Sequence, residues 1–215
     1  DGAAAMVVLS QERAAELGVQ PMARILGYAW SALDPAIMGM GPVKAVRTAM
    51  DRAGIDDVRI VEGGGDVGGA WYWNRYPGAM CDTAAMVYLP LLEETGHMPS
   101  KKYVYAPEIY GQARRIATTF GLYDNAVFST AVRSLEWDAD AARWVIHTDR
   151  GDAIRAKFVA MGTGPLHRPK LPGIPGIESF GGHCFHTSRW DYAYTGGSYE
   201  GAPLERLADK RVGII

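Results

Sequence analysis

The chain has 215 residues, 48% of them hydrophobic and 21% charged, which is enough for one large or two small domains with their own cores. Its 22 basic and 24 acidic side chains give a net charge of −2, which argues against nucleic acid as a partner. No stretch approaches the roughly 20 consecutive apolar residues that cross a bilayer, so no membrane association is expected. The two cysteines fit no zinc spacing, so we expect no metal and a cytoplasmic protein.

The first 54 residues mix helix and strand signals. Residues 3–9 are apolar and predict a strand or a buried helix. Ser10 is suited to cap a short helix, and residues 22–29 predict a strand. Pro42 is suited to the first turn of a second helix, which ends near Gly54.

The rest of the chain predicts one more strand, a glycine-rich bend, a helix and an antiparallel meander. Val58 to Glu62 is a short β-type run, and a helix is expected between Pro107 and Gly121. The meander has strands at 131–137, 144–148 and 153–161, and a Pro- and Gly-rich connector follows at 165–176. Residues 211–215 are apolar and predict a buried strand. Because the chain starts without methionine and stops in such a run, we expect a piece of a longer protein.

The strand at 58–62 ends in an acidic residue, as strands do where a dinucleotide-binding fold contacts a ribose. The carboxylate of Glu62 can accept hydrogen bonds from both ribose hydroxyls. The alternative is a solvated side chain at a strand end.

The glycine-rich segment 63–78 follows directly. Paired glycines let a backbone approach a flat or phosphorylated ligand, and the aromatic residues after them can pack against a ring system. The alternative is a tight turn with aromatic residues anchored in the core.

Residues 52–215 resemble the flavin-dependent Baeyer–Villiger monooxygenases. Three strings carry the resemblance: GGDVGGAWYWNRYPGAMCD at 64–82, YLPLLEETGHMPSKKYVYAPEI at 88–109, and FVAMGTGPLHRPKLPGIPGIESFGGHCFHTSRWD at 158–191. The last string contains the family fingerprint F-x-G-x-x-x-H-x-x-x-W-[P/D], read here as Phe180, Gly182, His186, Trp190 and Asp191.

The resemblance implies an enzyme that binds FAD and NADPH and uses O₂ to insert oxygen into a small ketone or to oxidise a heteroatom such as that of a sulfide. It implies that Glu62 contacts the FAD ribose and that Asp82 lies beside the flavin as a catalytic residue. It places Met80 and Cys81, with Asp82, where NADPH passes the flavin. The other implied cofactor contacts are Gly68, Gly69, Ala70, Trp71, Tyr72, Trp73, Tyr88, Val132, Gly162 and Pro165.

The fingerprint residue His186 has two interpretations. It could act as a general base, or it could fix the arrangement of two nucleotide-binding domains. We favour the second interpretation, and we interpret Phe180 and Trp190 as packing residues.

Two features of the resembled family are missing from the sequence. The first G-x-G-x-x-G turn, which places a pyrophosphate at a helix N-terminus, does not precede the strand at 58–62. The second turn and the family's active-site arginine would follow residue 215. We therefore expect weak FAD binding and no turnover by this chain alone.

Residues 1–50 resemble thiolases (acetyl-CoA acetyltransferases), through DGAAAMVVLSQERAAELG, ARILGYA and DPAIMGMGPVKAVRTAM. This resemblance implies that Met38 lines an acyl-CoA pocket, although the nucleophilic cysteine and the base are absent. The expected architecture is α/β: a thiolase-like strand-helix-strand piece at 1–54, a partial Rossmann-like FAD domain with the meander at 55–165, and a connector with the first NADP-domain strand at 166–215. The alternatives to a monooxygenase fragment are a thiolase-type acyltransferase remnant and a non-catalytic fusion product.

Overall fold

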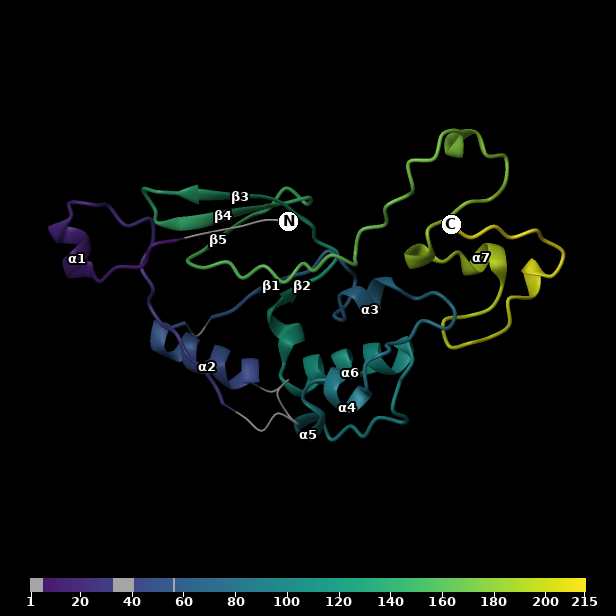
Figure 1. The fold of residues 1–215 in the computed structure, drawn as a ribbon, viewed down its shortest axis with the longest axis horizontal. Helices are drawn as coiled ribbons and strands as arrows, with labels where there is room; N and C mark the ends of the chain where they lie inside the picture. The colour runs from purple at the N-terminus through teal and green to yellow at the C-terminus, as the bar shows by residue number, and fades with distance from the viewer. Residues whose placement is uncertain (1–5, 33–40, 56) are drawn as a thin grey trace. The chain divides into compact units, whose positions relative to one another are not determined.

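The computed structural model describes residues 6–32, 41–55 and 57–215 (Figure 1). The chain divides into two compact units, one with residues 6–32 and 41–55 and the other with residues 57–215. The described residues contain both helices and strands, in an α/β arrangement that includes an antiparallel sheet. In the parts that are described, no helix is both long and apolar enough to cross a membrane.

The first unit contains two helices. Helix α1 (Gln11–Glu16) begins as predicted at Ser10, whose Oγ accepts a hydrogen bond from the Arg13 N–H at 3.1 Å. Helix α2 spans Gly41–Ala53, also as predicted. The expected Met38 contact lies outside the described residues. Residues 6–9, the described part of the segment predicted as a strand or buried helix, are irregular and exposed.

The strand predicted at 22–29 is wrong. This segment is irregular and passes alongside α2, where Arg52 Nη1 donates a hydrogen bond to the Tyr28 carbonyl oxygen at 2.6 Å. A Cβ at Gly27 would lie 2.8 Å from the Ala49 carbonyl oxygen. The segment lies against a helix, and no described strand pairs with its backbone.

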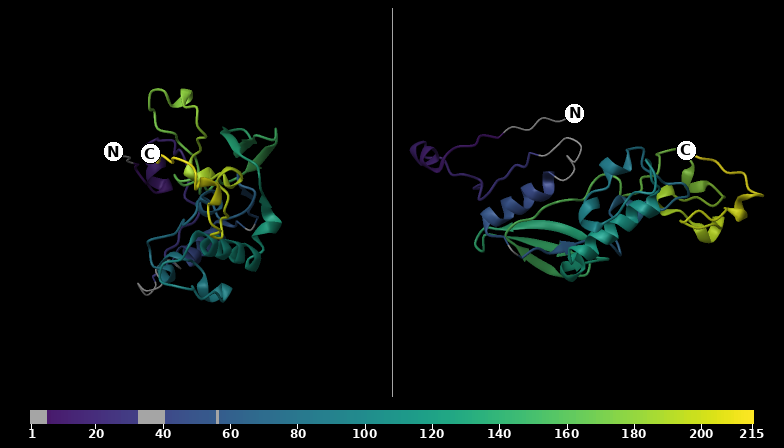
Figure 2. Two further views of the ribbon diagram at one scale, coloured as in Figure 1. Left: turned by 90° about the vertical axis from the view of Figure 1, so that its right-hand side faces the viewer. Right: turned by 90° about the horizontal axis from the view of Figure 1, so that it is seen from below.

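The second unit holds two small sheets. Strand β1 (Ile60–Val61) pairs in parallel with β2 (Ala126–Val127). Strands β3 (Val132–Asp138), β4 (Arg143–Thr148) and β5 (Ala153–Ala156) form the predicted antiparallel meander, which is visible edge to edge in Figure 2. The third strand stops at Ala156 and not at Met161. Ala156 pairs with Trp144, which is only one residue after the start of β4 at Arg143, so residues further along have almost no part of β4 left to pair with.

The helices of the second unit are short apart from α6 (Ala106–Thr119), which has Pro107 in its first turn as predicted. The others are α3 (Ala70–Trp73), α4 (Ala85–Tyr88), α5 (Leu92–Thr95) and α7 (Tyr192–Thr195), with 3₁₀ turns η2 (Leu122–Asn125), η3 (Ile177–Ser179), η4 (Thr187–Arg189) and η5 (Glu205–Leu207). The buried strand predicted at 211–215 is wrong: this segment is irregular, Ile214 and Ile215 are 89% and 91% exposed, and no described strand pairs with it.

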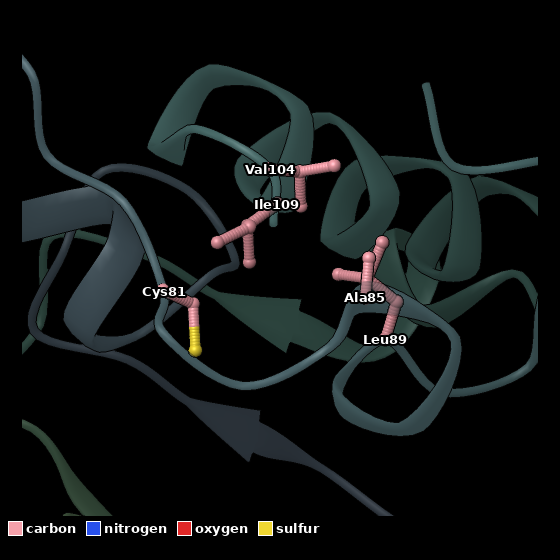
Figure 3. Close-up of a cluster of buried hydrophobic side chains, with 5 residues drawn as sticks. All are labelled: Cys81, Ala85, Leu89, Val104 and Ile109. Carbon is pink, nitrogen blue, oxygen red and sulfur yellow. The ribbon is translucent and has the colours of Figure 1, made fainter. Parts of the chain in front are cut away.

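A hydrophobic cluster joins α6 to the segment that precedes it (Figure 3). Trp71 and Leu92 pack against the outside of this cluster. Because four-residue helices are unstable alone, the cluster is what fixes α4 beside α6. Its members are Cys81, Ala85, Leu89, Val104 and Ile109.

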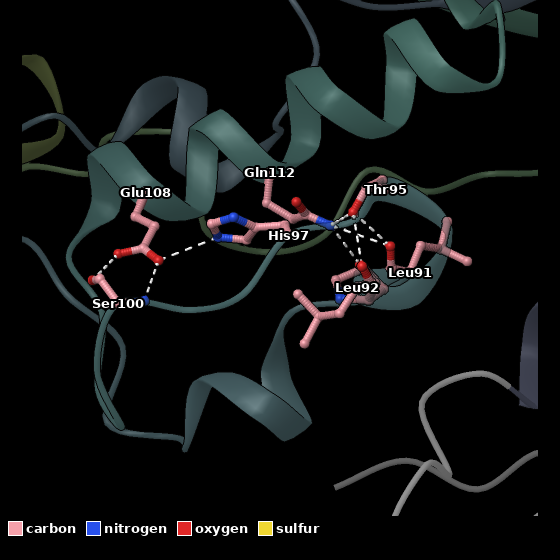
Figure 4. Close-up of polar contacts among 8 residues, drawn as sticks. Leu91, Leu92, Thr95, His97, Ser100, Glu108 and Gln112 are labelled. Carbon is pink, nitrogen blue, oxygen red and sulfur yellow. Dashed lines mark hydrogen bonds and ion pairs between the residues drawn. The ribbon is translucent and has the colours of Figure 1, made fainter.

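Polar side chains of α6 hold both α5 and the loop between α5 and α6 (Figure 4). The Glu108 carboxylate accepts hydrogen bonds from the N–H and hydroxyl of Ser100 and lies 3.2 Å from His97 Nε2. Partial burial alone would raise the pKa of Glu108, but the bonds from Ser100 and the nearby His97 outweigh it and hold that pKa below its usual value. The buried Gln112 donates to the Pro90 carbonyl oxygen and to Thr95 Oγ1, each at 2.9 Å.

Candidate functional site

A cavity of about 620 Å³ lies in the second unit. Eight of the residues predicted for a cofactor site or for the fingerprint line it. They come from α3, from the extended segment before α4, from α4 itself, from the connector and from the fingerprint. They are Ala70, Trp71, Met80, Cys81, Asp82, Tyr88, Pro165 and His186.

The glycine-rich bend places α3 at this cavity. Gly68 and Gly69 have φ values of +113° and +52°, which side chains disfavour. A Cβ on Gly68 would lie 2.8 Å from the Tyr110 ring, and one on Gly64 would lie 2.9 Å from the Tyr72 ring. The bend therefore needs glycine for close packing against tyrosine rings as well as for its backbone angles.

Two aromatic side chains on the cavity wall are joined directly. Trp71 Nε1 donates a hydrogen bond to the Tyr88 hydroxyl at 2.7 Å, and the two rings meet edge to face at 6.1 Å. The Tyr88 hydroxyl keeps its own proton, which can be donated to a ligand. This pair presents an apolar surface with one polar group, as ligand sites commonly do.

The segment before α4 alternates in exposure. The Cys81 N–H donates to the Val104 carbonyl oxygen at 3.3 Å, and Met80 pairs with Tyr105 in an isolated antiparallel bridge. As in any extended strand, successive side chains point to opposite sides. Cys81 therefore belongs to the core cluster while Met80 and Asp82 are exposed beside the cavity.

Glu62 lies next to the bend but does not line the cavity. Its Oε1 accepts a hydrogen bond from the Gly64 N–H at 2.6 Å, and its own N–H donates to the Val127 carbonyl oxygen at 2.9 Å. The Thr130 N–H donates to the Glu62 carbonyl oxygen at 3.0 Å, two residues before Val132. Glu62, predicted to contact the FAD ribose, and Val132, another predicted cofactor contact, are 70 positions apart in the chain but are brought near one another by this hydrogen bond, beyond the ends of β1 and β2.

Asp66 is a functional candidate that sequence reasoning missed. Its carboxylate accepts hydrogen bonds from Tyr110 at 2.5 Å, from Tyr123 at 2.8 Å and from the Val67 N–H at 2.8 Å, and it lies 3.5 Å from Arg114 Nε. Burial alone would raise the pKa of Asp66, but these bonds outweigh it and lower that pKa. Burial, followed by the bond to Asp66, raises the pKa of Tyr110 to about 12. The sequence signal that could have identified Asp66 is its place as an acidic residue between two pairs of glycines.

The connector is held both by the residue that follows α3 and by the fingerprint segment. Asn74 Nδ2 donates to the Leu166 carbonyl oxygen at 3.0 Å, and Arg189 Nη2 donates to the His167 carbonyl oxygen at 2.9 Å. The Arg189 guanidinium also lies 3.9 Å from the centre of the Trp73 ring, a cation–π contact. These contacts bring the fingerprint segment, the connector and α3 together around the cavity.

The fingerprint residues make mostly local contacts. His186 Nδ1 accepts a hydrogen bond from the Ser188 N–H at 3.1 Å and so caps η4. Trp190 Nε1 donates to Thr195 Oγ1 at 2.9 Å, and Asp191 Oδ1 accepts from the Tyr194 N–H at 3.0 Å. Phe180, interpreted as a packing residue, is 64% exposed, and its ring lies against Gly182, where a Cβ would be 2.5 Å from it.

The cavity divides the predicted site residues and adds others. Those that do not line it are Glu62, Gly68, Gly69, Tyr72, Trp73, Val132, Gly162, Phe180, Gly182, Trp190 and Asp191. Its wall also contains residues that were not predicted, all of them inside the matching strings or next to predicted positions: Asn74, Tyr76, Thr83, Leu166, Arg168, Lys170 and Ser188. Among the described residues, no group of three or more His, Cys, Asp or Glu side chains could hold a metal ion.

Comparison with known proteins finds extensive similarity to monooxygenases. A Baeyer–Villiger monooxygenase of Streptomyces coelicolor is 55% identical over 184 residues, which are 85% of this chain and 30% of that protein. The structure of a polycyclic ketone monooxygenase from the thermophilic fungus Thermothelomyces thermophila matches with a TM-score of 0.68 and 40% identity, over 75% of this chain and 28% of that one. The structure of OTEMO in complex with FAD and NADP matches with a TM-score of 0.62 and 32% identity, over 72% of this chain and 28% of that one.

The extent of these matches bears on the first 54 residues. Residues 55–215 are 161 of the 215 residues, so a relative that covers 85% of the chain must also match residues before 55. The comparisons give no evidence for a thiolase fragment. No family model matches the chain. The chain spans about 30% of the length of the curated relatives it matches.

Proposed function

Because the chain is homologous to Baeyer–Villiger monooxygenases over most of its length, we propose that it forms part of an FAD- and NADPH-dependent monooxygenase. The proposed reaction is insertion of oxygen into a small ketone or oxidation of a heteroatom. When bound, the flavin and nicotinamide would supply the redox chemistry with O₂. The residues of this chain would bind and orient them.

One observation carries the proposal: the cavity brings Trp71, Met80, Asp82 and Tyr88 together beside the glycine bend. Its volume of about 620 Å³ falls within the range typical of small-molecule sites, roughly 300–1,000 Å³. The Trp71 and Tyr88 rings offer an apolar wall for a flat ring system, and the Tyr88 hydroxyl offers a proton. The set of residues thus fits a flavin ring.

The proposed roles follow the geometry. The Trp71–Tyr88 pair would hold the ring system, with Ala70 and Pro165 also on the wall. Asp82 would place a negative charge beside the ring, and Met80 would line the side that the nicotinamide approaches. Cys81 lies between them at the cavity wall, with its side chain in the core cluster. Glu62 would accept hydrogen bonds from the ribose, with the β1–β2 pair as a partial Rossmann-like domain.

Predicted residues behind the cavity wall would hold this site together. Tyr72 packs against Gly64, and Trp73 receives the Arg189 guanidinium. The fingerprint residues would fix the segment that carries Arg189. His186 would contribute through its Nδ1, which accepts the hydrogen bond that caps η4. Gly162 would belong to the tight turn before Pro165.

Acyl transfer has less support. The cavity contains Cys81, but this residue is buried in the core cluster, and its Sγ accepts from the Thr83 N–H at 3.4 Å. A nucleophilic thiol is normally accessible and paired with a base.

Titration of the purified chain with FAD tests the proposal, with quenching of flavin fluorescence as the readout. We expect saturable binding that Trp71→Leu weakens about fivefold, which is the scale of one lost aromatic contact. The control Trp137→Leu removes a half-exposed tryptophan of β3, away from the cavity, and should leave binding unchanged. Absence of binding, or equal effects of the two substitutions, would refute the assignment of this cavity.

A further inference from the structure

We propose that Asp66 is the positioning residue of the glycine bend at 63–69, and that it sets α3 at the cavity wall through this bend. The inference rests on the proposed flavin site, because α3 supplies Ala70 and Trp71 to that wall. Asp66 itself does not line the cavity. Its action would therefore pass through the backbone that follows it.

The Asp66 carboxylate connects the bend to two other elements. Oδ2 accepts from the Tyr110 hydroxyl of α6 at 2.5 Å, and Oδ1 accepts from the Tyr123 hydroxyl of η2 at 2.8 Å. Oδ1 also accepts from the Val67 N–H at 2.8 Å, and Arg114 Nε of α6 lies 3.5 Å from Oδ2. The side chain is 20% exposed, so most of these contacts are shielded from water.

Tyr110 holds the bend at a second point. The same ring whose hydroxyl binds Asp66 would lie 2.8 Å from a Cβ at Gly68. The bend is thus fixed by a hydrogen bond at Asp66 and by close packing at Gly68, with only Val67 between them. Gly69 then caps α3, so an error in the bend would displace Ala70 and Trp71 directly.

The charge of the carboxylate is needed for this arrangement. Two hydroxyls and one N–H donate to its two oxygens, and an ionised carboxylate accepts all three. An asparagine in its place would keep the shape but present one amide NH₂ to a hydroxyl that now donates. We therefore expect Asp66→Asn to loosen the bend without removing much buried volume.

The experiment uses the full chain and compares Asp66→Asn with Asp140→Asn. Asp140 is an exposed residue of the turn between β3 and β4, and its side chain makes no hydrogen bond or ion pair among the described residues. For Asp66→Asn we expect amide hydrogen exchange at residues 64–73 to rise about tenfold and the Kd for FAD to rise about tenfold. Exchange in β3 and β4 should not change, and Asp140→Asn should leave both quantities unchanged.

Tyr123→Phe provides a second variant that removes one donor and leaves the carboxylate in place. It should raise the exchange rate at residues 64–73 and the Kd for FAD by a smaller factor than Asp66→Asn. If Asp66→Asn does not fold, this variant tests the role of Asp66 in its place. A lower melting temperature with unchanged exchange at 64–73 and unchanged Kd would overturn the inference, since a purely structural role gives that result. If the unsubstituted chain binds no FAD, the proposed function fails, while hydrogen exchange at 64–73 still decides the role of Asp66.

Discussion

At the scale of single residues, a hydrogen bond between two aromatic side chains joins separate parts of the cavity wall. Trp71 and Tyr88 are 17 positions apart in sequence and meet because α3 and α4 both lie beside the core cluster. Both residues were predicted as flavin contacts through the resemblance. Their mutual hydrogen bond was not predictable, since the pairing of two aromatic residues depends on how separate helices are placed.

Tyr88→Phe should weaken this wall. The substitution removes the acceptor for Trp71 Nε1, and Tyr88 is 39% exposed, so the expected loss in the free energy of unfolding is at most about 1 kcal/mol. Urea unfolding followed by tryptophan fluorescence measures it. Tyr103→Phe is the control, because that hydroxyl makes no hydrogen bond among the described residues. Equal stabilities for both variants would show that the bond contributes nothing.

At the scale of elements, short helices depend on the residues packed against them. Helix α3 has four residues, which is too short to be stable alone. Its position follows from the packing of Tyr72 against Gly64 and of Tyr110 against Gly68. The sequence predicted a bend followed by either ligand contacts or core anchors. In the structure Tyr72 packs against Gly64, while Trp71 lines the cavity and also packs against the core cluster.

Gly68→Ala should be clearly more destabilising than Gly96→Ala. Both glycines have positive φ: Gly96 at +64° lies in the left-handed region, where alanine costs about 1 kcal/mol, and Gly68 at +113° lies beyond it, where a side chain is disfavoured further. At Gly96 nothing lies within 4 Å of the added Cβ, whereas at Gly68 the Tyr110 ring would be 2.8 Å away. We expect Gly68→Ala to cost about 2 kcal/mol more. Chemical denaturation compares the two variants, and similar losses would contradict the packing argument.

The loop between α5 and α6 should open when Glu108 is removed. Glu108→Ala deletes the acceptor for both Ser100 groups and the partner of His97. Lys101 and Lys102 come directly after Ser100 and are exposed. Trypsin should therefore cut the Glu108→Ala variant after these lysines several times faster than it cuts the unsubstituted chain at neutral pH. Glu93→Ala, an exposed position on α5, should leave the cleavage rate unchanged. Equal rates for the two variants would show that Glu108 does not hold the loop.

At the scale of the whole molecule, stability is expected to be uneven. Helix α6 buries Ala106, Ile109, Gln112 and Ala117, and each strand of the β3–β4 pair bonds to a neighbour. Helix α1 has six residues and buries only Ala14. Because opening free energies follow burial and backbone pairing, the second unit contains the more stable elements.

Amide hydrogen exchange on the intact chain tests this distribution. Protection should be greatest in α6 and in β4, which is bonded on both sides, and least in α1. Exchange in α1 should approach the rate of an unstructured peptide. Strong protection of α1 would mean that contacts beyond those described stabilise it.

The sequence by itself determined the local elements whose signals lie within a few residues: the Ser10 cap, α2, α6 and the β3–β4–β5 meander. Through motif resemblance it also pointed to eight of the fifteen residues that line the cavity. Only the tertiary structure decided that residues 22–29 and 211–215 form no strand. A strand needs a neighbouring strand to pair with, and the sequence of a segment does not show whether such a neighbour lies beside it. The tertiary structure also decided the contacts of Asp66 and Arg189. The Asp66 carboxylate binds Tyr110 and Tyr123, and Arg189 lies over the Trp73 ring, so each contact joins residues that are tens of positions apart.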